Sequence, residues 1–239
     1  MKTFVLLSAA VTAASLVTAR ADILANWTFE SSGLGSTTPS FSPGANTPST
    51  NFYAELGLQA GTAAAFGLHV TAATYTGPAG NGSAKSLSAN NWSVGDFYEF
   101  TLSTLGYQGL SISFDQNGSG TGPANFKLAY STDGTTFNDV GTYTIPSGVT
   151  WTSGSPNPLG NTSFSFNLSA FSALDNIASA YFKIIDTSTT SVNGGTVGTG
   201  GTGRVDNFLV SASAVPEPAS SALALVGGFA WLLALRRKR

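Results

Sequence analysis

Side chains that commonly carry catalysis are scarce in this 239-residue sequence, which has no cysteine and a single histidine, His69. Without cysteine the chain has no thiol nucleophile, no disulfide and no zinc site of the Cys/His type. His69 lies in a predicted strand, and no Gly-x-Ser-x-Gly turn accompanies it to supply the serine of a hydrolase triad. We expect a packed or solvated histidine, and we predict that the chain has no catalytic residues.

The segment 198–203 matches the pattern G-x-G-x-x-G. In a dinucleotide site this pattern follows a strand and opens a helix, because the helix N-terminus binds the pyrophosphate. Here the following residues, 204–212, alternate in the manner of a strand. We therefore interpret 193–203 as a flexible glycine loop.

Carboxylates are the remaining side chains that could act in catalysis. Two acids held about 5–10 Å apart in a cleft hydrolyse glycosides. Glu30, Glu55 and Glu99 are available for such a pair, but nothing in their spacing selects two of them. A glycoside hydrolase is therefore the third of our functional hypotheses.

Aromatic rings in loops can stack on the faces of sugars. Trp92, Trp151 and Tyr53 lie in or near predicted loops, and we take Trp92 and Trp151 as the candidate ligand-stacking residues. Packing in the core, or over the ends of a sandwich, is the alternative explanation for these rings.

The charges of the chain are unevenly distributed. Ten Lys and Arg stand against twelve Asp and Glu, a formal net charge of −2, but six of the ten cations lie in 1–21 and 236–239. The segment 22–214 retains four basic and eleven acidic residues, a net charge of −7. An acidic body without a basic stripe excludes nucleic acid as a partner.

The N-terminus has the layout of a secretory signal peptide. Met1-Lys2 precedes the apolar run 4–17, and small residues stand at the −3 and −1 positions of a cut after Ala21. The apolar run is shorter than the ~20 residues that cross a bilayer, so a membrane helix is the weaker interpretation. We expect the mature chain to begin at Asp22, after passage through the secretion translocon.

The C-terminus combines a proline pair, an apolar stretch and a basic end. The uncharged residues 219–235 would span about 26 Å as a helix, enough for a thin bilayer. Flanking cations remain cytoplasmic, which places the body across the membrane. Pro216 and Pro218 cannot extend the helix upstream, so they leave an extended, protease-accessible segment.

This end resembles the PEP-CTERM sorting signal of exported bacterial proteins, with all three parts in order within 215–239. The resemblance implies processing by an exosortase, a membrane protease that cuts near the motif, and a final location at the cell surface or in the polysaccharide matrix of a Gram-negative bacterium. It assigns the recognition motif to Val215, Pro216, Glu217 and Pro218, and the stop-transfer signal to Arg236, Arg237, Lys238 and Arg239. A single-pass anchor retained uncut is the alternative.

The body, 22–214, contains short segments of period-two alternation separated by Gly, Asn, Pro and Asp clusters. Such segments bury one face and expose the other, as antiparallel sheets allow. They predict an all-β, two-sheet antiparallel β-sandwich of the jelly-roll kind, with a hairpin at Asp133-Gly134. Only 169–176 has weak helical character, and 55–66 fits either a short helix or an irregular strand. The predicted strands are 23–30, 68–75, 97–103, 109–116, 125–132, 136–145, 162–169, 180–186 and 204–212.

The segments 27–30 and 204–207 resemble the first and last strands of MAM-like and carbohydrate-binding jelly rolls. The resemblance implies that these strands pair and that Glu30 and Asp206 help to bind a structural Ca²⁺, the one cofactor we consider. Hard carboxylate oxygens suit Ca²⁺, although a full set of 6–8 oxygens is not visible in the sequence. Two unrelated acidic side chains are the alternative.

Our leading hypothesis is an exported, non-enzymatic β-sandwich protein, sorted by its tail and acting structurally or by adhesion at the cell surface or in the extracellular matrix. The alternative is a carbohydrate-binding jelly-roll module. Both hypotheses expect an exosortase during export, an extracellular polysaccharide as the candidate partner, and membrane contact through 219–235 before processing.

Overall fold

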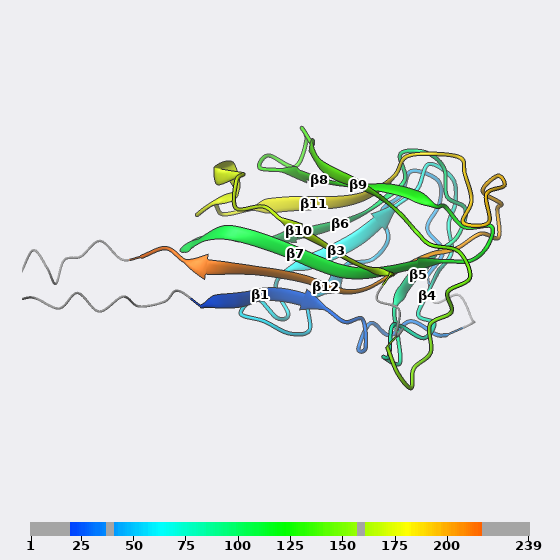
Figure 1. Ribbon diagram of the computed structural model, residues 1–239, viewed down its shortest axis with the longest axis horizontal. Helices are drawn as coiled ribbons and strands as arrows, with labels where there is room; N and C mark the ends of the chain where they lie inside the picture. The colour runs from blue at the N-terminus through cyan, green and yellow to red at the C-terminus, as the bar shows by residue number, and fades with distance from the viewer. Residues whose placement is uncertain (1–19, 37–40, 157–160, 217–239) are drawn as a thin grey trace, which may run out of the picture.

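The computed structural model describes residues 20–36, 41–156 and 161–216. Two six-stranded antiparallel sheets pack face to face as a sandwich (Figure 1). The first sheet has the order β10-β7-β12-β5-β4, with β1 also paired to β12, and the second has the order β2-β3-β6-β11-β8-β9. The strands are β1 (Ala21–Trp27), β2 (Phe52–Tyr53), β3 (Ala64–Leu68), β4 (Tyr75–Thr76), β5 (Leu87–Ala89), β6 (Phe97–Leu102), β7 (Tyr107–Gly118), β8 (Asn125–Ser131), β9 (Asn138–Thr144), β10 (Ser163–Asn167), β11 (Ala180–Asp186) and β12 (Gly203–Ala214).

The predicted all-β sandwich is confirmed, and eight of the nine predicted strands overlap β1 and β6 to β12. The predicted hairpin joins β8 to β9, with Gly134 in the left-handed region at φ 73°. The segment with weak helical character contains a short 3-10 helix, Ser172–Leu174. In 55–66 the structure has turns that lead into β3.

The predicted strand 68–75 is wrong, because β3 ends at Leu68 and β4 begins only at Tyr75. The intervening backbone binds side chains instead of a neighbouring strand. Val70 N donates to Asp96 Oδ1 (2.8 Å), and Thr74 N donates to Asn90 Oδ1 (2.7 Å). Side-chain acceptors of this kind compete with a sheet ladder and hold the segment as a loop.

Aromatic side chains from the two sheets interdigitate in the core. The rings of Phe100 on β6 and Phe208 on β12 stack with centroids 3.6 Å apart and planes at 4°. Trp27 on β1 meets the edge of Phe100 at 5.2 Å and donates from Nε1 to the Phe52 carbonyl (3.0 Å). Burial of these large rings supplies the apolar area that stabilises a domain without disulfides.

The first and last strands pair, as the resemblance to jelly-roll domains implies. Their antiparallel register runs from Ala21 opposite Ser213 to Trp27 opposite Phe208. The beginning of β1 and the end of β12 therefore lie side by side at one end of the sandwich (Figure 1). The opposite end is where β7 finishes and β12 begins, with Gly203 opposite Gly118.

The predicted terminal signals fall largely outside the described residues. This applies to 1–19, Glu217, Pro218, the apolar stretch 219–235 and the basic residues 236–239. The described part of the predicted sorting motif lies against the sandwich, since Val215 N donates to the Gly106 carbonyl (2.8 Å). Within the described ranges, no helix combines the length and apolarity needed to cross a bilayer.

Candidate functional site

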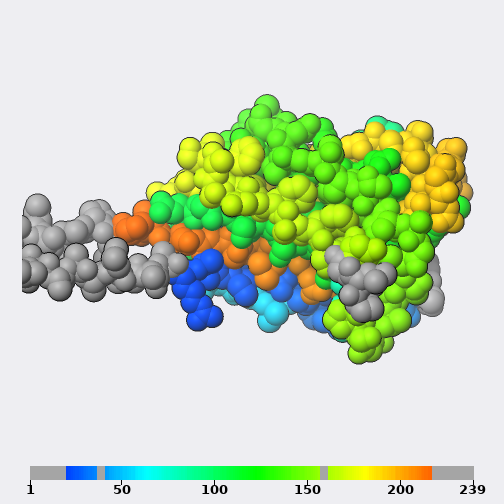
Figure 2. Space-filling model, in the orientation of Figure 1, coloured from blue at the N-terminus to red at the C-terminus, as the bar shows by residue number. Residues whose placement is uncertain are grey.

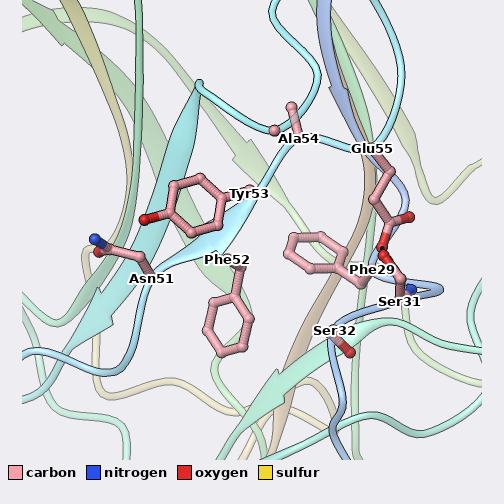
Figure 3. A pocket seen from close by; sticks show the side chains of 9 residues that line it. Phe29, Ser31, Ser32, Asn51, Phe52, Tyr53, Ala54 and Glu55 are labelled. Carbon is pink, nitrogen blue, oxygen red and sulfur yellow. Dashed lines mark hydrogen bonds between the residues drawn. The ribbon is translucent and has the colours of Figure 1, made fainter.

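A half-open pocket of about 310 Å³ lies between the segment that follows β1 and strand β2 (Figure 3). Phe29 and Phe52 form its apolar floor, with rings edge to face at 6.2 Å and with 2% and 4% of each residue exposed. Tyr53 and Asn51 stand on one side of these rings in Figure 3, and Ser31, Ser32 and Glu55 stand on the other. The pocket thus combines an apolar base with two polar walls.

Strand β2 positions the first wall although it is only two residues long. Phe52 pairs with Ala65 and Tyr53 pairs with Ala64 on β3. Because successive side chains in a strand point to opposite faces, this pairing directs Phe52 inward and Tyr53 outward. Tyr53 is consequently 53% exposed. Two residues are too few to show an alternating pattern, so the sequence does not predict β2.

Glu55 fixes the second wall by binding the turn that follows β1. Its carboxylate accepts hydrogen bonds from Glu30 N (3.0 Å), Ser31 N (2.5 Å) and Ser31 Oγ (2.6 Å), and also from the Thr28 hydroxyl. Burial alone would raise the pKa of Glu55, but the hydrogen bonds from Ser31 and Thr28 lower it below its usual value. These hydrogen bonds join the turn that follows β1 to the segment that follows β2.

The first wall keeps hydrogen-bonding groups free for a ligand. Neither the Asn51 amide nor the Tyr53 hydroxyl bonds to any other described side chain or backbone group. An amide offers both donors and an acceptor, and a phenol offers one of each. An exposed ring, an apolar floor and unused polar groups suit a small ligand that is apolar on one face and hydroxylated at its edge.

The structure corrects the expectation that Trp92 and Trp151 are exposed stacking residues. Trp92 is 5% exposed, lies 4.4 Å from the ring of His69, and donates from Nε1 to the Ala89 carbonyl (2.8 Å). Trp151 is 4% exposed and donates from Nε1 to Thr162 Oγ1 (3.2 Å). Both indoles satisfy their N–H groups within packed surroundings, so neither presents a free face. Of the three candidate rings, Tyr53 is the exposed one.

The acids of the predicted calcium site bind one loop, between β4 and β5. Glu30 accepts from Lys85 N (2.9 Å), and buried Asp206 accepts from Asn81 N (2.9 Å) and Ser83 Oγ (2.7 Å). Burial raises the pKa of Asp206 to about 6. The described residues contain no group of three or more His, Asp or Glu set to hold a metal, so further oxygens would have to come from carbonyls or water. Calcium binding stays a prediction.

The carboxylates considered for hydrolysis are engaged with protein groups. Glu55 and Glu30 hold the turn and the loop described above. Glu99 lies on β6 in the second sheet and pairs with Lys183 Nζ at 3.3 Å.

His69 belongs to a buried polar cluster that the sequence does not reveal. Its Nδ1 lies 3.3 Å from the Asn91 carbonyl and 3.5 Å from Asp96 Oδ2. Burial lowers the pKa of His69, against the opposing charge of Asp96. Buried Asp186 is the last residue of β11, and its backbone N donates to the Asp96 carbonyl (2.9 Å). The cluster is enclosed, so it is part of the core and not an open site.

Comparison with known proteins finds solved structures but no sequence family. No family model matches the chain, and no curated protein matches it. The solved structures described below are between 11% and 15% identical to this chain, so the likeness concerns the β-sandwich fold alone.

Three of these structures illustrate the range. One holds the CBM22-1 and GH10 modules of Clostridium thermocellum xylanase 10B with xylohexaose, at 14% identity and a TM-score of 0.42, over 83% of this chain and 29% of that one. Another is a carbohydrate-binding module of the β-sandwich superfamily, at 15% identity and a TM-score of 0.37, over 77% and 60%. A third is the K1 adhesin domain of Lys-gingipain from Porphyromonas gingivalis W83, at 11% identity and a TM-score of 0.34, over 60% and 84%.

Proposed function

We propose that this chain is a non-catalytic carbohydrate-binding β-sandwich protein and that the pocket beside β2 is a sugar site. The observation that carries the proposal is the exposed ring of Tyr53 next to the unused Asn51 amide, above a buried aromatic floor. A sugar ring has an apolar C–H face and a hydroxylated rim. The Tyr53 ring would cover the face, while the amide and the serine hydroxyls would bind the rim.

The dimensions of the pocket limit the ligand. Its volume of about 310 Å³ lies at the lower end of the ~300–1,000 Å³ range of small-molecule sites. We expect it to hold one or two sugar rings, such as the end or a short stretch of a polysaccharide. A site of this size gives modest affinity, which suits attachment through many copies on one surface.

The location of the protein is also part of the proposal. We propose export through the signal peptide 1–21, transient anchoring by 219–235 and processing by an exosortase at Val215–Pro218. The pairing of β1 with β12 supports this arrangement, because Ala21 and Ser213, which are close in sequence to the two signals, lie opposite each other at one end of the sandwich. A protein anchored there would direct its far end toward the extracellular matrix.

The test is glycan-array screening followed by titration calorimetry with the neutral oligosaccharide that binds best. Tyr53→Ala is expected to weaken binding about tenfold, which corresponds to about 1.4 kcal/mol. Tyr53→Phe retains the ring and is expected to lose less.

Leu105→Ala is a matched control for Tyr53→Ala, because Leu105 is 58% exposed and does not line the pocket. We expect this variant to bind like the wild type. Absence of neutral-glycan binding by the wild type, or unchanged affinity in Tyr53→Ala, would overturn the proposal.

A further inference from the structure

A second pocket, of about 330 Å³, lies at the end of the sandwich far from the start of β1 and the end of β12. It is enclosed by the end of β7, the loop that follows β9 and the loop between β11 and β12. The β11–β12 loop is the yellow and orange segment at the far end in Figures 1 and 2. The lining includes Asn117, Ser119, Thr150, Trp151, Asn193 and Arg204.

Arg204 differs from the other cations of the body because its side chain has neither an ion pair nor a hydrogen bond within the described residues. The other three are engaged: Lys85 Nζ donates to the Leu34 carbonyl (2.6 Å), Lys127 pairs with Asp139 (2.7 Å), and Lys183 pairs with Glu99 (3.3 Å). Arg204 takes part in none of the ion pairs found among the described residues. Its Nε is buried and has no hydrogen-bond partner in the structure.

The fold fixes Arg204 in this position. It lies at the beginning of β12, opposite Asn117 on β7 and Ser88 on β5, so its backbone is held from both sides. Burial lowers the pKa of Arg204, with Tyr98 opposing, yet a guanidinium stays protonated in proteins. A half-buried positive charge without a counter-charge is costly in free energy. A bound anion would remove that cost.

The rest of the lining is uncharged: it contains no Asp or Glu, and it combines polar side chains with glycines and with Val149, Trp151 and Val192. The Asn117 side chain connects the end of β7 to the loop that follows β9. Its Nδ2 donates to the Val149 carbonyl (3.3 Å), and its Oδ1 accepts from Gly118 N (2.8 Å). Asn193 extends from the β11–β12 loop, where its backbone N donates to the Gly120 carbonyl (2.9 Å). Its exposed amide makes no side-chain hydrogen bond with the described part of the chain.

We propose that this pocket binds the carboxylate of an acidic sugar, with the Arg204 guanidinium as the carboxylate fork and the Asn193 amide as a neutral donor. The planar guanidinium matches a carboxylate through two parallel N–H···O bonds. The choice of a sugar as the carrier of the carboxylate rests on the proposed function. In a body of charge −7, one unpaired cation in a neutral pocket selects a single acidic group and does not attract polyanions in general.

The test compares acid and ester forms of the same sugar by calorimetry on the purified full-length chain in detergent. The probes are short oligomers of galacturonic, glucuronic and mannuronic acid and their methyl esters. At least one acid is expected to bind tenfold or more tightly than its ester, with an affinity that falls as salt is added. Arg204→Gln is expected to remove this preference, and Arg204→Lys to keep part of it.

Two further variants provide a charge control and a second, independent test of the pocket. Lys127→Gln removes the same charge from an exposed ion pair and is expected to keep the preference. Asn193→Asp places a negative charge on an exposed loop of the pocket, so it tests the site even if Arg204→Gln does not fold. We expect Asn193→Asp to weaken binding of the acid tenfold or more.

The outcomes separate this inference from the proposed function. Equal binding of acids and esters, a preference that survives in Arg204→Gln, or displacement of the acid by sulfate at equal concentration would each overturn the carboxylate site. If neutral glycans still bind in a Tyr53-dependent manner, the proposed function stands in those cases. If no neutral or acidic sugar binds the wild type, both proposals fail.

Discussion

Phe29 has a backbone conformation that its side chain disfavours, with φ at 58°. The other described non-glycine residues in this region are all asparagines, which tolerate it. The surrounding contacts hold the strained residue, since its ring is buried against Phe52 and the following turn is bound by Glu55. Strained residues often lie at functional sites, and this one forms the floor of the pocket beside β2.

Buried carboxylates give the protein a pH dependence that can be measured. Burial raises the pKa of Asp186 to about 6, the Ser188 backbone N–H lowers it less, and Asp96 adds to the increase. One of its oxygens, Oδ2, has no hydrogen-bond partner in the described structure. The folded-state pKa exceeds the unfolded value, so the protonated form stabilises the fold. That contribution is fully present below about pH 4 and is lost as the pH rises through about 6.

We therefore predict that Asp186→Asn is more stable than the wild type at pH 7.5, by up to about 3 kcal/mol for a shift of about two pKa units. Near pH 3.5 the two proteins are expected to have similar stability. Urea unfolding at both pH values measures the difference. Asp139→Asn, on the exposed edge strand β9, is the matched control. A constant difference between Asp186→Asn and the wild type at all pH values would contradict the assignment.

At the scale of the elements, the pairing of β1 with β12 is the central feature. It places Glu30, just after the first strand, and Asp206, within the last strand, against the same β4–β5 loop. Neither strand neighbours this loop in the sequence. The loop therefore depends on two carboxylates, and these are the residues that the resemblance assigns to calcium.

We predict that EDTA lowers the melting temperature of the wild type, because removal of a ligand bound only by the folded state destabilises it. A site saturated about 100-fold above its Kd would contribute about 2.7 kcal/mol. Asp206→Ala is expected to melt at the same temperature with and without EDTA, while Asp139→Ala should respond as the wild type does. Differential scanning fluorimetry measures these shifts. Equal EDTA shifts in wild type and Asp206→Ala would exclude calcium at Asp206.

At the scale of the whole molecule, the start of β1 and the end of β12 lie at one end of the sandwich, and the Arg204 pocket lies at the other. An arrangement of this kind suits a protein attached at one end and exposed at the other. The sorting hypothesis depends on residues beyond 216, so it is tested on the intact protein in its cell.

We predict that the released protein lacks residues 219–239. Deletion of 236–239, or Glu217→Ala, is expected to leave a larger precursor in the membrane, because the stop-transfer or recognition element is lost. Intact-mass spectrometry of the released and membrane fractions distinguishes the species. Detection of 219–239 on the released wild-type protein would show that the tail is not removed.

The sequence by itself determined the fold class and most strands. Period-two alternation in long strands such as β7 and β12 reflects one buried face, and this signal is local. The Asp133-Gly134 turn is also local, because glycine accommodates its positive φ there. The absence of thiol and disulfide chemistry was also predictable, because it follows directly from the absence of cysteine in the sequence.

Only the tertiary structure decided which side chains meet. Trp92 and Tyr53 both lie in segments with loop-like sequence, yet Trp92 is buried and Tyr53 is exposed. Tyr53 points outward because β2 pairs with β3. Trp92 lies between Asn90 and Asp96, whose side chains bind the backbone of the loop 69–74. The isolation of Arg204 from every described carboxylate is likewise a property of distance in space. Contacts between residues far apart in the chain depend on packing of both sheets at once, which local patterns do not encode.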